Sequence, residues 1–276
     1  MKHGYLIDMD GVIYRGGEAI PGAAEFIRYL QQEGIPYLFL TNNSAYTPHD
    51  VVVKLRKFDI DTTREHVYTS AVATADWVRQ QKPDGTAFVI GEGGLLNALA
   101  DVNYAITSEK PDYVIVGEGR GLNYEQAEKA HRFIANGSHL ISTNADTWCP
   151  TDHGPRPGCG AIVAMLESAT GRKAYHVGKP NPFMMREARK KIGLSTDEVI
   201  MVGDTMDTDI RGATDLSFQS ILVLTGSTTL QTLSEYPFRP TRVVNSIAEL
   251  VPKGWKSRQR TRFSEDVLLH DTMPAL

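Results

Sequence analysis

The chain has 276 residues, of which 41% are hydrophobic and 22% are charged, a composition typical of folded globular proteins rather than disordered ones. The formal net charge of -4 gives no global basic field that would attract nucleic acid. No apolar run approaches the roughly 18 residues of a membrane helix, and two cysteines are too few for a disulfide scaffold. We therefore expect a cytoplasmic protein with one large domain or two modest ones.

Short apolar runs alternate with amphipathic segments along the chain. Apolar residues at helical spacing predict helices over residues 23–32, 71–81 and 124–135. Strands that alternate with helices of about ten residues indicate βαβ units and a mainly parallel sheet, so the predicted fold class is α/β. The predicted strands are Tyr5–Asp8, Pro36–Leu40, His66–Tyr68, Ala87–Ile90, Tyr113–Val116, His139–Ser142, Ala174–Val177, Val199–Val202, Ser220–Leu224 and Arg242–Val244.

Three of the predicted strands lie in the middle of the chain and form a group of their own. They predict a second, smaller α/β unit over residues 82–175, inserted into a core made of residues 1–81 and 176–276. The turn cluster Lys82-Pro83-Asp84-Gly85 is a plausible exit from the core. The tail after Pro252 is interpreted as a surface appendage or a packing arm.

Two strand–glycine turns of the insert, Val89–Gly93 and Ile115–Gly119, resemble each other. They are either a weak duplication or what any two such units look like. The Gly91–Gly94 turn lacks the third glycine of a dinucleotide-binding loop, so no nicotinamide cofactor is expected.

Four of the predicted strands end in a polar or glycine-containing turn. In open parallel sheets, ligands bind outside the carboxyl ends of the strands. We therefore expect an aspartate, a threonine, a lysine and a second aspartate in one crevice. The four strand ends are Leu6-Ile7-Asp8, Phe39-Leu40-Thr41, Val177-Gly178-Lys179 and Met201-Val202-Gly203-Asp204.

Each turn taken alone also has an ordinary structural interpretation. The Asp8–Asp10 segment is equally a polar strand end with an aspartate turn, and Asp204–Asp209 is equally a helix N-terminus, where carboxylates are favoured. Lys179 alone would be a solvated charge. Thr41–Ser44 offers donors that can hold phosphate oxygens, or an N-cap cluster for the next helix, and both can be true together.

In order and spacing, the motifs together resemble those of the haloacid dehalogenase superfamily of phosphatases. Asp8-x-Asp10-Gly-Val matches the first motif, Thr41-Asn42 the second, Lys179 the third, and Gly203-Asp204-x-x-x-x-Asp209 the fourth. The insert has the position of the type C2 cap of that superfamily. The segments Asp10–Tyr14, Thr41–Ser44 and Val177–Pro180 are similar to the NagD-like and p-nitrophenyl-phosphatase-like branch.

The resemblance implies a Rossmann-like core with a cap, and a Mg²⁺-dependent phosphatase that works through an aspartyl-phosphate. Asp8 would be the nucleophile, and Asp8 and Asp204 would bind the metal through their side chains. Asp10 would be the general acid and would bind the metal through its backbone carbonyl, while Asp209 would support the site. The charges are consistent with this, because Mg²⁺ and Lys179 would offset three carboxylates and a phosphate dianion.

Substrate-binding residues are implied on both parts of the chain. Thr41, Asn42 and Lys179 would stabilise the transferring phosphoryl group, and the cap would choose the leaving group through Asn144 and Asp146. Trp148 and Arg156, in the same cap loop, are weaker candidates for substrate contact.

The implied partner is a small phosphorylated metabolite, with nucleoside monophosphates such as UMP as the best guess. Sugar phosphates, phosphoglycolate and p-nitrophenyl phosphate are alternatives, and no nucleic-acid polymer or membrane is expected. A homo-oligomer is compatible with the sequence. A non-catalytic phosphate-binding protein is the competing class, but such a protein would be expected to have lost Asp8, Asp10 or Asp204.

A zinc site in the same loop is not expected. Cys149, His153 and Cys159 offer only three ligands at irregular spacing, whereas structural zinc usually has four.

Overall fold

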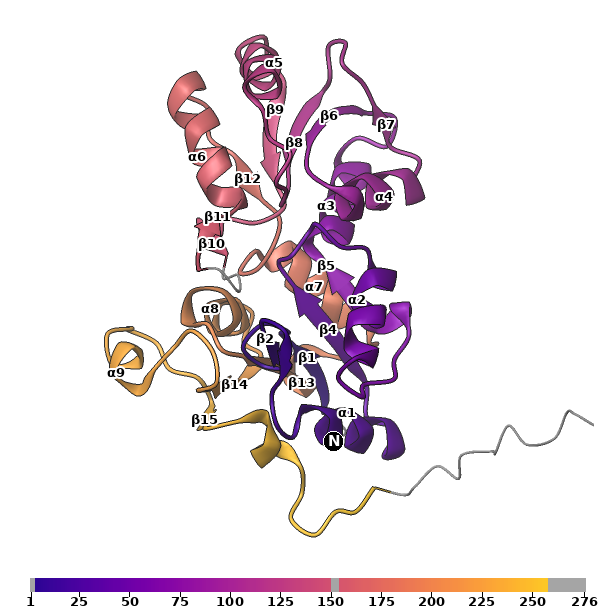
Figure 1. The fold of residues 1–276 in the computed structure, drawn as a ribbon, viewed down its shortest axis with the longest axis vertical. Coiled ribbons are helices and arrows are strands. Elements are labelled where there is room, and N and C mark those ends of the chain that lie inside the picture. The colour runs from indigo at the N-terminus through magenta and orange to yellow at the C-terminus, as the bar shows by residue number, and fades with distance from the viewer. Residues whose placement is uncertain (1–2, 150–153, 258–276) are drawn as a thin grey trace, which may run out of the picture.

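The computed structural model describes residues 3–149 and 154–257, and it confirms the α/β class. Two parallel sheets form its framework, with strand orders β15-β14-β13-β1-β4-β5 and β12-β9-β8-β6-β7. We call the six-stranded sheet with its helices the core body and the five-stranded sheet with its helices the cap body. In Figure 1 the cap body lies above the core body. The N-terminus of the described chain belongs to the core body. Residues 258–276, which are most of the tail discussed above, and His153 lie outside the described residues.

The strands are short, and β4, β5, β8 and β13 are buried along their whole length. The core sheet contains β1 (Gly4–Ile7), β4 (Tyr37–Thr41), β5 (Val67–Thr69), β13 (Val199–Gly203), β14 (Gln219–Val223) and β15 (Arg242–Val244). The cap sheet contains β6 (Thr86–Ile90), β7 (Ala105–Ile106), β8 (Tyr113–Val116), β9 (His139–Ser142) and β12 (Tyr175–His176). Two antiparallel hairpins consist of β2 (Tyr14–Arg15) with β3 (Glu18–Ala19) and β10 (Trp148–Cys149) with β11 (Arg156–Pro157).

The helices follow the predicted pattern and start at recognisable signals, such as the Thr47–Asp50 capping box of α2. The α-helices are α1 (Ala23–Gln32), α2 (Pro48–Arg56), α3 (Ser70–Gln81), α4 (Gly93–Asp101), α5 (Tyr124–Ala135), α6 (Cys159–Thr170), α7 (Pro182–Lys191), α8 (Arg211–Asp215) and α9 (Leu230–Leu233). Short 3₁₀ turns are η1 (Arg64–His66), η2 (Thr196–Glu198) and η4 (Ile247–Leu250), and η3 (Met206–Ile210) is a π-helical turn. Among the described residues, no helix is both long and apolar enough to cross a membrane.

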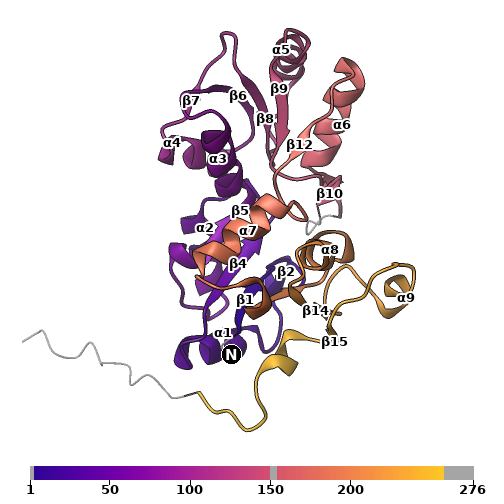
Figure 2. The same cartoon turned by 180° about the vertical axis from the view of Figure 1, so that it is seen from behind.

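The core sheet is covered on both faces because successive strand residues point to opposite sides. Ile7 joins a hydrophobic cluster with residues of α1 and α2, whereas its neighbour Leu6 joins a cluster with residues of α3, α7 and α8. Figure 2 shows α7 crossing in front of β4 and β5. Buried strands of this kind bring their carboxyl ends to one edge, which is the edge that faces the cap body.

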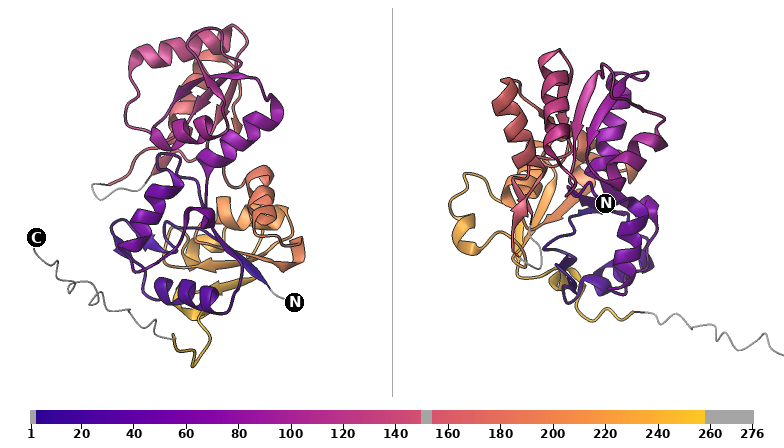
Figure 3. Two further views of the ribbon diagram at one scale, coloured as in Figure 1. Left: turned by 90° about the vertical axis from the view of Figure 1, so that its right-hand side faces the viewer. Right: turned by 45° about the horizontal axis from the view of Figure 1, so that its top comes forward.

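The two bodies share one hydrophobic cluster. One face of the cap sheet packs against α5 and α6, and its other face contributes Ile115 and Ile141 to the cluster that also holds Leu6 and Leu38 of the core sheet. Helix α3 contributes Val78 to the same cluster and connects the two bodies along the chain. Figure 3 shows the cap body seated on the core body at this junction.

The chain returns from the cap body to the core body through a segment that is held on several sides. The ring of Tyr175 stacks on Trp77 of α3, with 4.7 Å between the ring centroids. The side chain of Asn181 accepts a hydrogen bond from the Tyr175 hydroxyl (3.4 Å) and donates one to the His176 carbonyl (2.6 Å). These contacts fix the position of Lys179, which lies within the returning segment.

The predicted strand at 174–177 differs from the expectation in its location. The sequence places it in the core with the other three strand ends, but β12 pairs with β9 in the cap sheet. Lys179 therefore reaches the site from a connecting segment rather than from the end of a core strand. The remaining predicted strands all appear, whereas β2, β3, β7, β10 and β11 were not predicted.

Candidate active site

Three carboxylates gather at the carboxyl edge of the core sheet. Asp8 follows β1, Asp204 follows the neighbouring strand β13, and Asp209 lies in the π-helical turn η3. They are 8%, 3% and 0% exposed, and one oxygen of each lies within 4.8 Å of the others. Such π-helical turns are frequent at functional sites.

Lys179 is the cation of this cluster. Its ammonium nitrogen lies 2.5 Å from Asp8 Oδ1 and 2.7 Å from Asp209 Oδ1, and the side chain is 3% exposed. Burial alone would lower the pKa of Lys179, but Asp209 and Asp8 raise it above its ordinary value, so the amine stays charged.

One ammonium group does not balance three buried carboxylates. Burial, followed by the charge of Asp209, raises the pKa of Asp8 well above its ordinary value. Burial also raises the pKa of Asp209, although Lys179 opposes the shift. The site thus has an excess of negative charge that a cation would relieve.

A loop that the sequence did not indicate completes the surroundings of Asp204. Its Oδ2 accepts a hydrogen bond of 2.5 Å from the backbone nitrogen of Ser227, and its Oδ1 accepts one of 3.1 Å from the Thr205 hydroxyl. Ser227 follows β14, and its contact is made by the backbone, so no residue type in that segment signals it.

Asp10 stands apart from the three carboxylates. Its side chain is accessible to solvent, and Oδ2 accepts a hydrogen bond of 3.3 Å from the Tyr14 hydroxyl. Surrounding protein atoms still remove part of its hydration, and this desolvation raises the pKa of Asp10, against the opposing charge of Lys54. A raised pKa favours the protonated form that an acid catalyst needs.

Thr41 and Asn42 lie at the end of β4, next to β1 in the sheet. Thr41 is 4% exposed, and its hydroxyl accepts a hydrogen bond from the Asn43 backbone nitrogen. The Asn42 amide is occupied within the protein: Oδ1 accepts from Lys179 N (2.8 Å), and Nδ2 donates to the Lys179 carbonyl and to Asp146 Oδ2 (3.1 Å each). Asn42 therefore ties the segment that carries Lys179 to the core and to the cap.

The two candidate residues of the cap, Asn144 and Asp146, both form hydrogen bonds with Asn42 of the core. Asn144 is 1% exposed, donates a hydrogen bond of 2.8 Å to the Asn42 carbonyl, and accepts one from Asp146 N. Asp146 is partly exposed and receives the Asn42 amide described above; burial raises its pKa. These contacts favour a positioning role for Asn144 and leave part of Asp146 accessible.

The two weaker candidates for substrate contact, Trp148 and Arg156, have different surroundings in the structure. Trp148 is 56% exposed on β10, whereas the Arg156 guanidinium forms an ion pair of 2.8 Å with Glu118, whose side chain is 3% exposed.

Burial raises the pKa of the Cys149 thiol and that of the Cys159 thiol to about 12 each, so both are protonated. Among the described residues, only Asp8, Asp204 and Asp209 form a cluster suited to a metal ion.

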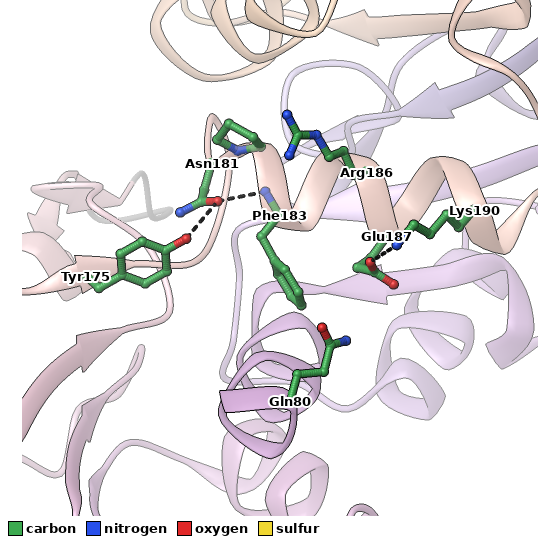
Figure 4. A pocket seen from close by; sticks show the side chains of 8 residues that line it. Gln80, Tyr175, Asn181, Phe183, Arg186, Glu187 and Lys190 are labelled. Carbon is green, nitrogen blue, oxygen red and sulfur yellow. Dashed lines mark hydrogen bonds and ion pairs between the residues drawn. The ribbon is translucent and has the colours of Figure 1, made fainter. Parts of the chain in front are cut away.

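The donor set fits a hard divalent cation. Three carboxylates offer only oxygen ligands, which Mg²⁺ prefers to nitrogen or sulfur. A hollow of about 520 Å³ lies elsewhere, beside α7, where Tyr175, Asn181 and Arg186 line it (Figure 4). None of its lining residues belongs to the acidic cluster.

Comparison with known proteins identifies the family. Residues 5–105 match the haloacid dehalogenase-like hydrolases, and residues 176–250 match a second model of this hydrolase type. The chain is 40% identical over 246 residues to a dihydroxyacetone phosphatase of Corynebacterium glutamicum, covering 89% of this chain and 90% of that protein. It is 39% identical over 245 residues to the ribonucleotide monophosphatase NagD of Escherichia coli, covering 89% and 96%.

Solved structures give the same result. NagD from Escherichia coli superposes with a TM-score of 0.85 at 38% identity, covering 90% of this chain and 97% of that one. A thermostable NPPase from Geobacillus stearothermophilus superposes with a TM-score of 0.84 at 41% identity, covering 93% and 98%. The chain belongs to the haloacid dehalogenase-like hydrolase family, and the resemblance to its NagD-like branch is confirmed.

The tight turn after Asp10 yields a first prediction. Gly11 has φ +79°, and a Cβ there would lie 2.7 Å from Asp204 Oδ2. We expect Gly11→Ala to lower the free energy of unfolding by about 1–3 kcal/mol and to reduce turnover, because Asp204 must move. Gly17→Ala is the matched control, since a Cβ at Gly17 meets nothing within 4 Å. Chemical denaturation and steady-state assays measure both; equal behaviour of the two variants would contradict the prediction.

Proposed function

We propose that this hydrolase is a Mg²⁺-dependent phosphatase that acts on small phosphomonoesters through an aspartyl-phosphate on Asp8. The observation that carries the proposal is the buried cluster of Asp8, Asp204 and Asp209 around Lys179 at the carboxyl edge of the core sheet. Its relatives named as phosphatases support the same reaction class.

The metal would be held by Asp8, Asp204 and the backbone carbonyl of Asp10. When bound, Mg²⁺ supplies the positive charge that lets a phosphate dianion approach these carboxylates. Asp209 would support the site through Lys179, whose ammonium it contacts at 2.7 Å.

Asp8 would act as the nucleophile. Its carboxylate oxygen attacks phosphorus while the bond to the leaving oxygen breaks, and Asp10 gives its proton to that oxygen. Asp10 then takes a proton from the water that hydrolyses the aspartyl-phosphate, which restores both groups. This splits one difficult displacement into two.

Phosphoryl stabilisation would combine charge with positioning. Lys179 places a charged amine beside Asp8, and the Thr41 turn offers hydroxyl and backbone donors. Asn42 would act mainly by holding the Lys179 backbone, since its amide already bonds both the nitrogen and the carbonyl of that residue.

We further propose that residues 1–81 and 176–276 form the catalytic core domain and that residues 82–175 form a cap that selects the leaving group. The exposed Trp148 ring could stack on a nucleobase, which supports nucleoside monophosphates as substrates. Two free cysteines fit the reducing conditions of the cytoplasm, where we place the activity.

The nucleophile is tested by Asp8→Asn. We expect phosphate release to fall at least about 1,000-fold while the fold persists, because Lys179 keeps its contact with Asp209. Asp207→Asn is the matched control, since Asp207 hydrogen-bonds Tyr236 outside the cluster. Clean Asp8→Asn protein that releases phosphate at the wild-type rate would remove Asp8 from this role.

The metal is tested by removal and return. We expect chelation to abolish phosphate release and Mg²⁺ to restore it. Saturation with Mg²⁺ should also stabilise the fold, by about 2.7 kcal/mol at one hundred times Kd. Asp204→Asn should lose that stabilisation in thermal unfolding. Full activity in the presence of a chelator would rule out the metal.

The substrate is tested by a panel of phosphomonoesters. We expect the highest kcat/KM for nucleoside monophosphates, with sugar phosphates, phosphoglycolate and p-nitrophenyl phosphate below them. A higher value for a sugar phosphate would replace the nucleotide proposal, and no release from any member with Mg²⁺ present would refute the enzyme proposal.

A further inference from the structure

Glu118 is a buried carboxylate of the cap body that the proposed chemistry does not use. It lies two residues after the end of β8 and is 2% exposed. A buried carboxylate is costly unless hydrogen bonds and an opposite charge compensate for the lost hydration. Its partners therefore show what the position is built to hold.

Within residues 3–149 and 154–257, the side chain has three hydrogen-bond partners, which belong to the β10–β11 hairpin or are the first residue of α6. Oε2 accepts a hydrogen bond from Arg156 Nη2 at 2.8 Å. Oε1 accepts from Cys149 Sγ and from Cys159 N, each at 3.3 Å. One carboxylate thus holds both strands of the hairpin and the start of the following helix.

The backbone of Glu118 is tied to the core body. Its nitrogen donates a hydrogen bond of 2.7 Å to the Ser44 hydroxyl, which also receives the Thr143 hydroxyl at 2.9 Å. Ser44 is fully buried and lies in the turn that begins with Thr41 and Asn42. Glu118 therefore links the turn proposed to hold phosphate to the hairpin of the cap.

The hairpin carries the exposed Trp148, and it lies at the end of the cap body that faces the core body (Figure 1). Two residues before Trp148, Asp146 contacts Asn42 of the core. The position of the Trp148 ring relative to the acidic cluster is therefore set from both sides, by Asp146 and by the Glu118 contacts.

We infer that Glu118 is a specificity-determining positioning residue, which with Arg156 fixes the hairpin so that Trp148 can stack on an aromatic leaving group. The inference rests on the proposed phosphatase function and names the part of the site that selects the substrate class. Small aliphatic phosphomonoesters have no ring to stack, so their hydrolysis does not depend on the position of Trp148.

Glu118→Gln is the most informative change. The amide keeps the size and one acceptor oxygen, but it removes the ion pair with the Arg156 guanidinium, so the hairpin loses its fixed position. Glu92→Gln is the matched control: Glu92 occupies the similar turn after β6, and its carboxylate accepts a hydrogen bond from the Arg120 backbone nitrogen. Its charge also acts on Arg156, but within the described part of the chain the ion pair of Arg156 is with Glu118.

The kinetic test compares a nucleoside monophosphate with glycerol phosphate. We expect Glu118→Gln to lower the ratio of their kcat/KM values about tenfold, through KM of the nucleotide, and to leave kcat for glycerol phosphate within about twofold. Arg156→Met should do the same, and the double variant should be no worse than either single one, because the two residues act as a pair. Glu92→Gln should leave the ratio unchanged.

A second measurement does not need turnover. Acrylamide quenching of Trp148 is obtained by comparing each protein with its Trp148→Phe form, and we expect Glu118→Gln to change it while Glu92→Gln does not. An unchanged ratio, an equal loss on both substrates, or unchanged quenching would overturn the inference. Wild-type protein that hydrolyses no ester of the phosphomonoester panel would instead refute the proposed function, and quenching would still decide whether Glu118 positions Trp148.

Discussion

The excess of buried negative charge at one sheet edge is the constraint on which the rest of this structure depends. Among the described residues, Asp8, Asp204 and Asp209 share the ammonium group of Lys179, and burial raises the pKa values of Asp8 and Asp209 although Lys179 opposes the shift. Lys179 contacts two of the three carboxylates, but its one positive charge does not offset the cost of burying three negative charges. A divalent cation bound at this cluster, as proposed above, would relieve that excess of charge.

The architecture serves this cluster by keeping its members on rigid elements. Asp8 and Asp204 follow neighbouring parallel strands whose last residues are buried, so their separation is set by the sheet. Lys179 comes from the segment between the two bodies, where Asn42 holds its backbone on both sides of the residue. Because the hydrophobic cluster of the core sheet extends into the cap body, the two bodies pack as one interior rather than as separate lobes.

Much of this was predictable from the sequence because it depends on local patterns. Apolar runs that end in Asp8, Thr41 and Asp204 gave the strand ends, and helical spacing gave α1 and α5 with the bounds that the structure shows. The sheet to which β12 belongs could not be predicted, since a strand of two residues takes its partner from its surroundings. The backbone contacts of Asn42 and Asn144 could not be predicted either, because a side-chain amide can bind a phosphate or a backbone group equally well.

Glu118 shows the same limit most clearly. Its sequence context is nearly that of Glu92, yet one side chain is buried against Arg156 and the other meets a backbone nitrogen. The difference arises because Arg156 is 38 residues further along and returns to Glu118 only when the hairpin folds over the end of β8. The contacts of the acidic cluster lie within the core and the returning segment, whereas the hairpin contacts Glu118 of the cap. The bonds to Ser44 and Asn42 of the core come from Glu118 and Asp146, which lie outside the two strands of the hairpin. Under the proposed function, changes in the hairpin would therefore alter which leaving group fits while the charged residues of the acidic cluster stay in place.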